Sequence, residues 1–119
     1  MTVAKVMIVD DDRNMVKLLQ TLLTLDGFTV SFEARAEAVL GAIRQEKPDV
    51  ILLDKNLAGA DGLEVLSQIR ADSEVGRVPV VIASGEDVGY RCKEAGANDF
   101  ILKPYSPDQL SDILKKILA

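Results

Sequence analysis

The stretch Val50-Ile51-Leu52-Leu53-Asp54 places four consecutive apolar side chains directly before a carboxylate. Apolar residues at successive rather than alternating positions are typical of a strand that is buried on both faces of a parallel sheet. Four more short apolar runs occur at residues 6–9, 29–32, 80–83 and 100–102. The sequence therefore predicts five strands.

Helical patterns separate these runs. One apolar stripe has spacings of three and four residues and consists of Met15, Leu18, Leu19, Leu22 and Leu23. Further helices are predicted at residues 39–43, 63–69 and 87–95, and the last of these is weakened by Gly89.

A fifth helix is predicted after the last strand. Ser106 suits the N-cap, Pro107 the first helical position and Gln109 the third position of a capping box. The chain therefore alternates strand and helix five times. This order predicts an α/β fold, (βα)5, in which five helices cover a doubly wound, five-stranded parallel sheet.

Length and composition limit the classes of protein that fit. The 119 residues suit one domain, and 14 basic against 19 acidic residues give a net charge of −5. An acidic chain argues against direct binding of nucleic acid. The absence of histidine excludes histidine-based metal sites and Ser-His-Asp catalysis.

Other features indicate where the protein resides. Cys92 is the single cysteine and has no partner for an intrachain disulfide, which favours a reducing compartment. No apolar run approaches the roughly 20 residues that a bilayer span needs. We therefore expect a cytoplasmic protein with no membrane contact.

Polar groups of complementary chemistry follow four of the predicted strands. They are Asp10, Asp11 and Asp12 after the first, Asp54 after the third, Ser84 after the fourth and Lys103 after the fifth. Sheets of this type bind ligands at the carboxyl ends of their strands. Carboxylates gathered there favour either a raised pKa or a hard divalent cation such as Mg²⁺, and a carboxylate can also act as a nucleophile toward phosphorus.

Each residue alone has a simpler interpretation. Asp12 suits the N-cap of the first helix, which we expect to be its role. Asp54 and Ser84 alone suit turns, and Lys103 alone suits a solvated surface. The joint pattern at four strand ends favours a functional site.

The same residues resemble the receiver domain of two-component response regulators. The resemblance covers nearly the whole chain and rests on Val9-Asp10-Asp11, Leu53-Asp54, Asp61-Gly62, Ala83-Ser84 and Lys103-Pro104. It implies a flavodoxin-like fold. It also implies that Asp54 accepts a phosphoryl group from a phosphohistidine on a histidine kinase or histidine phosphotransfer protein.

The resemblance also implies a cofactor and its ligands. The cofactor is Mg²⁺, with Mn²⁺ as a substitute. Its ligands would be Asp11 directly, Asp10 through water, Asp54, and Asn56 through its backbone carbonyl.

Further roles follow from the resemblance in the same way. Lys103 would pair with the phosphoryl group, and the Lys103–Pro104 peptide bond would be cis. Ser84 and Phe100 would form the switch, and Asn56 and Glu86 would tune the phosphate lifetime.

The chain departs from the family pattern in three places. Leu57-Ala58-Gly59-Ala60 stands where many members have Met-Pro-Gly-Met, and residues 84–96 are about one helical turn shorter than usual. The chain also ends after its fifth helix. We therefore expect residues 1–119 to form one receiver domain without an output domain.

The leading hypothesis is a phosphoacceptor signalling switch that is not an enzyme, apart from its own phosphorylation and dephosphorylation. Its downstream partner would be an effector protein or a fused output domain. The alternative is a pseudo-receiver that binds a partner without phosphorylation. A metal-dependent phosphatase fits less well, because Asn56 stands where such enzymes place a second Asp as general acid.

Overall fold

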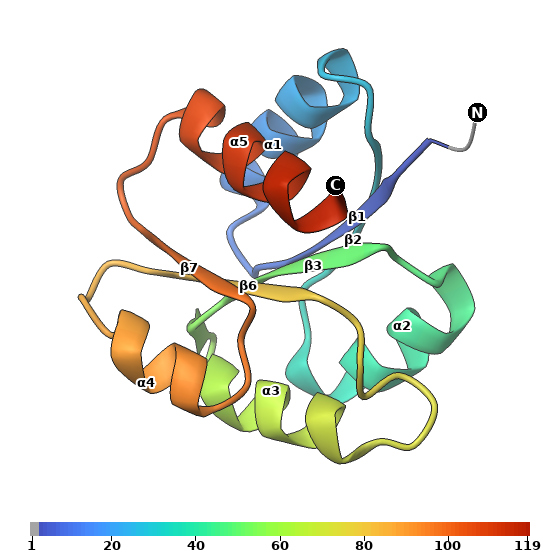
Figure 1. Ribbon diagram of the computed structural model, residues 1–119, viewed down its shortest axis with the longest axis vertical. Coiled ribbons are helices and arrows are strands. Elements are labelled where there is room, and N and C mark those ends of the chain that lie inside the picture. The colour runs from blue at the N-terminus through green and yellow to red at the C-terminus, as the bar shows by residue number, and fades with distance from the viewer. Residues whose placement is uncertain (1–2) are drawn as a thin grey trace.

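Five parallel strands form the central sheet of the computed structural model, which describes residues 3–119 (Figure 1). They are β1 (Lys5–Val9), β2 (Thr29–Glu33), β3 (Val50–Asp54), β6 (Val80–Ser84) and β7 (Asp99–Leu102). Their order in the sheet is β2-β1-β3-β6-β7, and all neighbours are parallel. The predicted doubly wound parallel sheet is therefore confirmed.

Helices cover both faces of this sheet. Figure 1 shows α1 (Arg13–Leu25) and α5 (Pro107–Leu118) on one face. The other face carries α2 (Val39–Glu46), α3 (Gly62–Ala71) and α4 (Gly89–Glu94), and a short 3₁₀ turn at Ala36–Ala38 precedes α2. No helix within residues 3–119 is long and apolar enough to cross a membrane.

The two helical layers explain the apolar runs in the strands. Every residue of β3 and β6 is buried, because helices pack against both faces of these central strands. Leu52 faces the cluster that includes Leu110 and Leu114 of α5, whereas Leu53 faces the cluster that includes Leu66 of α3. Successive strand residues thus enter opposite halves of the core.

Two helix starts follow the sequence pattern closely. The carboxylate of Asp12 accepts hydrogen bonds from the backbone N–H groups of Asn14 and Met15, at 3.1 and 3.2 Å, which confirms it as the N-cap of α1. At α5, Ser106 and Gln109 form the reciprocal capping box.

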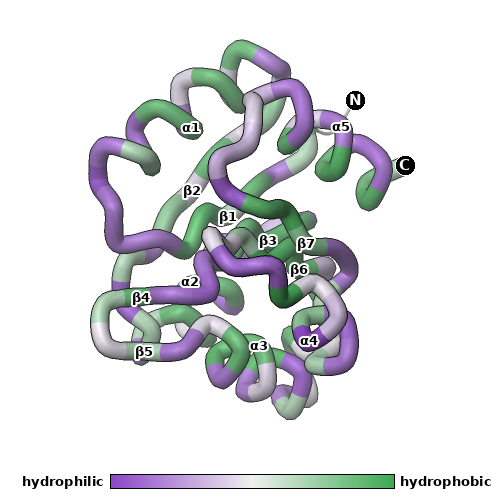
Figure 2. The backbone as a smooth tube through the Cα atoms, turned by 90° about the vertical axis from the view of Figure 1, so that its left-hand side faces the viewer, coloured by the Kyte–Doolittle hydropathy of each residue, from purple (hydrophilic) through white to green (hydrophobic). Residues whose placement is uncertain are grey.

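A small antiparallel hairpin extends beyond the predicted elements. Its strands are β4 (Asn56–Leu57) and β5 (Ala60–Asp61), which lie side by side in Figure 2. Strands of two residues are too short to show a hydrophobic period, so the pattern of the sequence did not indicate them. The hairpin leads the chain from the end of β3 into α3.

Candidate functional site

Asp10 and Asp54 lie next to each other at the carboxyl edge of the sheet. Val9 of β1 pairs with Leu53 of β3, so the residue that follows each one reaches the same edge. The winding of the sheet reverses between these two strands, which is the usual position of a ligand site in this architecture. Carboxylate oxygens of Asp10, Asp11 and Asp54 all lie within 4.8 Å of one another.

Asp10 is almost fully buried, with 6% of its surface exposed. Its Oδ1 accepts a hydrogen bond of 2.9 Å from the backbone N–H of Asp12. Burial raises the pKa of Asp10 and the charge of Asp54 adds to this, which together outweigh the opposing effects of the Asp12 hydrogen bond and the Lys103 charge. Ionised Asp10 is therefore disfavoured by its burial and by the neighbouring charge, and a bound cation would offset this unfavourable free energy.

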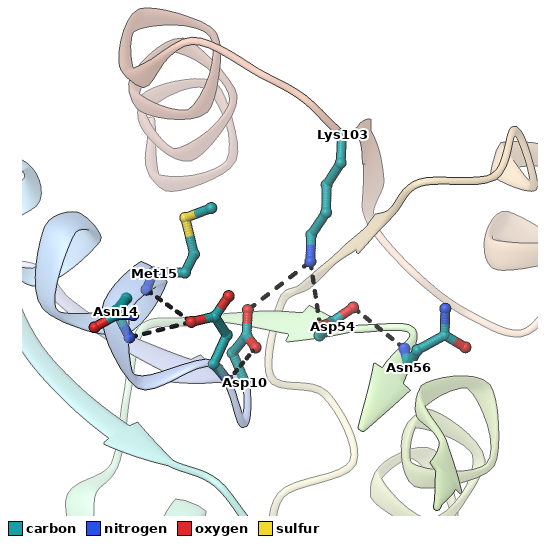
Figure 3. Close-up of polar contacts among 7 residues, drawn as sticks. Asp10, Asn14, Met15, Asp54, Asn56 and Lys103 are labelled. Atoms are coloured by element: carbon teal, nitrogen blue, oxygen red, sulfur yellow. Dashed lines mark hydrogen bonds and ion pairs between the residues drawn. The ribbon is translucent and has the colours of Figure 1, made fainter. Parts of the chain in front are cut away.

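Lys103 supplies one positive charge to this edge. Its Nζ lies 3.2 Å from Oδ2 of Asp54 and 3.9 Å from Oδ2 of Asp10. Dashed lines mark both contacts in Figure 3. The other oxygen of Asp54 accepts a 3.2 Å hydrogen bond from the backbone N–H of Asn56. The Lys103–Pro104 peptide bond, which follows directly, is cis.

The acidic cluster suits a hard divalent cation. Mg²⁺ prefers carboxylate and carbonyl oxygens and usually keeps several waters. Asp10 and Asp54 are buried whereas Asp11 is exposed, so an ion held among them would remain open to solvent and to a ligand. A pocket of about 470 Å³ adjoins the cluster and is lined by Asp11 and by residues of the β4–β5 hairpin, including Asn56.

Ser84 ends β6 beside the cluster and is only 1% exposed. Ala83 pairs with Asp54, so Ser84 lies one residue further along the same edge. Its hydroxyl accepts a 3.0 Å hydrogen bond from the backbone N–H of Glu86, and its carbonyl accepts one of 2.8 Å from the N–H of Lys103. The side chain is therefore engaged with its own loop.

The remaining residues singled out in the sequence lie around this centre. Phe100 is half-buried on β7, where it pairs with Ile82 and packs against the core on the α2–α4 side. Glu86 lies on the loop after β6 and Asn56 begins β4, and both residues are exposed. The predicted residues thus lie at or near one edge of the sheet, except Phe100, which pairs with Ile82 further back along β6.

The Asp61-Gly62 pair has a structural reason. A Cβ atom on Gly62 would lie 2.3 Å from the backbone oxygen of Asp54 and 2.7 Å from Cα of Lys55. Only glycine allows the first turn of α3 to approach the end of β3 so closely. Asp61 caps the same helix by accepting a 2.9 Å hydrogen bond from the N–H of Leu63.

Two residues near the site were not singled out in the sequence. Lys55 is only 9% exposed although it follows Asp54 directly. Tyr105 is partly buried, and this burial, followed by the charges of Asp10 and Asp54, raises the pKa of its phenol to about 12. Only the position of Tyr105, two residues after Lys103, could have indicated from the sequence that it lies near the site.

The amino-acid sequence matches a known protein family over most of its length. The family model described as the response regulator receiver domain matches residues 6–115. The chain belongs to this family. The family expected from the sequence motifs is thereby confirmed, and receiver domains are signalling domains that bind Mg²⁺ in general.

Individual relatives show how far the likeness of this receiver domain extends. It is 37% identical over 120 residues to a probable transcriptional regulator, ycf27, of Guillardia theta, covering 98% of this chain and 46% of that protein. It is 34% identical to sporulation initiation phosphotransferase F of Bacillus subtilis, covering 96% of this chain and 93% of that protein. The chain thus spans about half the length of several curated relatives that it matches.

Solved structures agree with this placement. The BeF3-activated N-terminal receiver domain of Klebsiella pneumoniae RstA superposes with a TM-score of 0.87 at 31% identity, covering 96% of this chain and 97% of that one. The receiver fold therefore extends over nearly all of the chain.

Proposed function

We propose that this receiver domain is a phosphoacceptor switch. Asp54 takes a phosphoryl group from a phosphohistidine on a histidine kinase or histidine phosphotransfer protein. The observation that carries this proposal is the position of the Asp54 carboxylate, with acidic metal ligands on one side and Lys103 at 3.2 Å on the other.

The chemistry follows from these neighbours. A carboxylate oxygen of Asp54 forms a bond to phosphorus, while the bond between phosphorus and the imidazole nitrogen of the donor breaks and its electron pair stays on that nitrogen. Asp10, Asp11, Asp54 and the carbonyl of Asn56 would hold Mg²⁺ or Mn²⁺, which supplies positive charge to the transferred phosphoryl oxygens. Lys103, which contacts the free carboxylate of Asp54, then pairs with the phosphoryl group attached to Asp54.

The new dianion also changes the loops around it. The hydroxyl of Ser84 leaves the N–H of Glu86 and donates to a phosphoryl oxygen, and Phe100 moves into the space that this rearrangement opens. The face formed by α4, β7 and α5 changes as a result. A complete switch from 1:99 to 99:1 requires a preference of about 5.5 kcal/mol for the active state.

The signal ends when water hydrolyses the acyl phosphate. Asn56 and Glu86 are exposed beside the site, where their side chains would influence the approach of that water. This self-limited reaction is that of a signalling domain rather than of an enzyme with turnover, and we propose that the domain acts in the cytoplasm. Its output would reach an effector protein or a fused output domain, without direct contact to nucleic acid.

Phosphorylation by a small donor tests the proposal. Incubation with acetyl phosphate and Mg²⁺ should add one phosphoryl group, read by intact mass, and a chelator should prevent the addition. Asp54→Asn should add none, whereas Asp108→Asn, which alters an exposed carboxylate in the first turn of α5, should behave as the parent does.

Two outcomes would count against the proposal. A parent protein that neither gains mass nor binds Mg²⁺ would contradict it. Equal binding of the partner protein by the parent and by the Asp54→Asn variant would instead support the phosphorylation-independent module.

A further inference from the structure

Phe100 rests against a residue that has no side chain. A Cβ atom built on Gly89, the first residue of α4, would lie 3.1 Å from Cδ1 of Phe100, 3.5 Å from its Cγ and 3.7 Å from its Cε1. Such a contact is tighter than nine in ten real Cβ contacts, so a side chain at residue 89 would push the ring back by a few tenths of an ångström. Gly85, four residues earlier in the segment between β6 and α4, differs: a Cβ there would meet nothing within 4 Å.

This position of the ring coincides with a particular state of Ser84. The Ser84 hydroxyl accepts its hydrogen bond from the N–H of Glu86, within its own loop. Ser84 and Phe100 lie on neighbouring strands, β6 and β7, which pair in register. The contact of the Phe100 ring with Gly89 and the hydrogen bond between Ser84 and Glu86 therefore occur together in this structure.

We propose that Gly89 is a positioning residue for the switch. In the unphosphorylated, or resting, state the Phe100 ring would occupy the space beside the Cα of Gly89. The size of residue 89 would then set how strongly this state is favoured over the active state. This inference rests on the proposed function, because it concerns the equilibrium that phosphorylation of Asp54 would shift.

The expected direction follows from packing. A methyl group at residue 89 would crowd the ring in its resting place, and crowding of this kind is destabilising. The same methyl group would not crowd a ring that has moved toward Ser84. Because only the resting state is penalised, any ligand that selects the active state should bind more tightly.

The test compares Gly89→Ala with Gly85→Ala. Beryllofluoride with Mg²⁺ serves as the phosphoryl mimic, since it accompanies the activated form of the RstA receiver domain. Its apparent affinity, measured by NMR titration, should rise about threefold in Gly89→Ala. It should stay unchanged in Gly85→Ala. Equal affinities in the two variants, or weaker binding by Gly89→Ala, would overturn the inference.

A double-mutant cycle separates the ring from the helix. Alanine also favours helix formation over glycine, which would act on α4 whatever residue 100 is. In a Phe100→Leu background the effect of Gly89→Ala on beryllofluoride affinity should therefore disappear. If it persists undiminished, the substitution acts through α4 and the proposed role of Gly89 is wrong.

A ligand-free measurement keeps this inference distinct from the proposed function. Gly89→Ala should shift the aromatic NMR resonances of Phe100 in the unphosphorylated protein, and Gly85→Ala should not. Unshifted resonances would overturn the contact itself. A parent protein that fails to bind beryllofluoride would instead contradict the phosphoacceptor proposal, whatever the ring resonances show.

Discussion

The helices α4 and α5 flank the same strand, β7, but are built differently. α5 has 12 residues, a complete capping box, a proline in its first turn, Asp108 near its start and two lysines in its last turn. α4 has six residues, begins at a glycine and has Val88 at its N-cap, where no side-chain hydrogen bond forms. One helix is stabilised by its own sequence, and the other is held by its contacts with the sheet.

This difference bears on how the proposed switch would act on the face formed by α4, β7 and α5. Cys92 of α4 is fully buried, and the aromatic ring of Phe100 packs against Gly89. A helix that relies on such contacts rearranges when the contacts change, whereas a well-capped helix keeps its place. The switch would therefore act chiefly on α4, the helix with the weaker local stabilisation of the two.

Truncation of the buried anchors should give the largest effect. Leu114 of α5 is fully buried, so Leu114→Ala should lower the free energy of unfolding by about 3 kcal/mol, as expected when a large core side chain is removed. Cys92→Ala in α4 removes one atom and should cost about 1 kcal/mol. Urea denaturation measures both. Equal losses would show that α4 is anchored as firmly as α5.

Removal of the α5 cap should have an intermediate effect. The Ser106 hydroxyl accepts a 3.1 Å hydrogen bond from the N–H of Gln109, so Ser106→Ala should cost about 1 kcal/mol in urea denaturation. Ser67→Ala, on the exposed side of α3, is the matched control and should change stability by less than about 0.5 kcal/mol. A loss no greater than that of the control would mean that the cap contributes little.

The pH dependence of a contact between α1 and α5 should be the smallest effect. The hydrogen bond from Ser111, then that from Lys115, holds the pKa of Asp26 below its ordinary value. A lowered pKa gives stability that is present above the ordinary pKa and is lost as pH falls through the lowered one. Asp26→Asn should therefore lower Tm slightly at pH 7.

The same difference should vanish at acidic pH. Thermal unfolding of the parent and of Asp26→Asn, measured from pH 7 downward, should begin to converge below the ordinary aspartate pKa of about 3.8 and should coincide below the lowered pKa of the folded state. Asp112→Asn, at an exposed position of α5, serves as the control. A Tm difference that persists unchanged at low pH would show that the carboxylate charge is not its source.

Local signals predicted much of the fold. The apolar runs marked all five strands of the sheet, and the capping residues marked the starts of α1 and α5. The β4–β5 hairpin was missed because its strands have two residues each. The burial of Lys55 was missed because a strand apolar at every position does not reveal which face its next residue takes.

The common edge reached by Asp10, Asp54, Ser84 and Lys103 could likewise be predicted from the sequence, because each of these residues directly follows an apolar run. Hydrophobic periodicity and helix capping depend on residues that are close together in the sequence, so both can be recognised from the sequence alone. Contacts between distant segments depend instead on the order of strands, which is set by burial over the whole molecule. Only the tertiary structure brings Lys103 to 3.2 Å from Asp54 across 49 residues of chain, and only it lays the ring of Phe100 on Gly89.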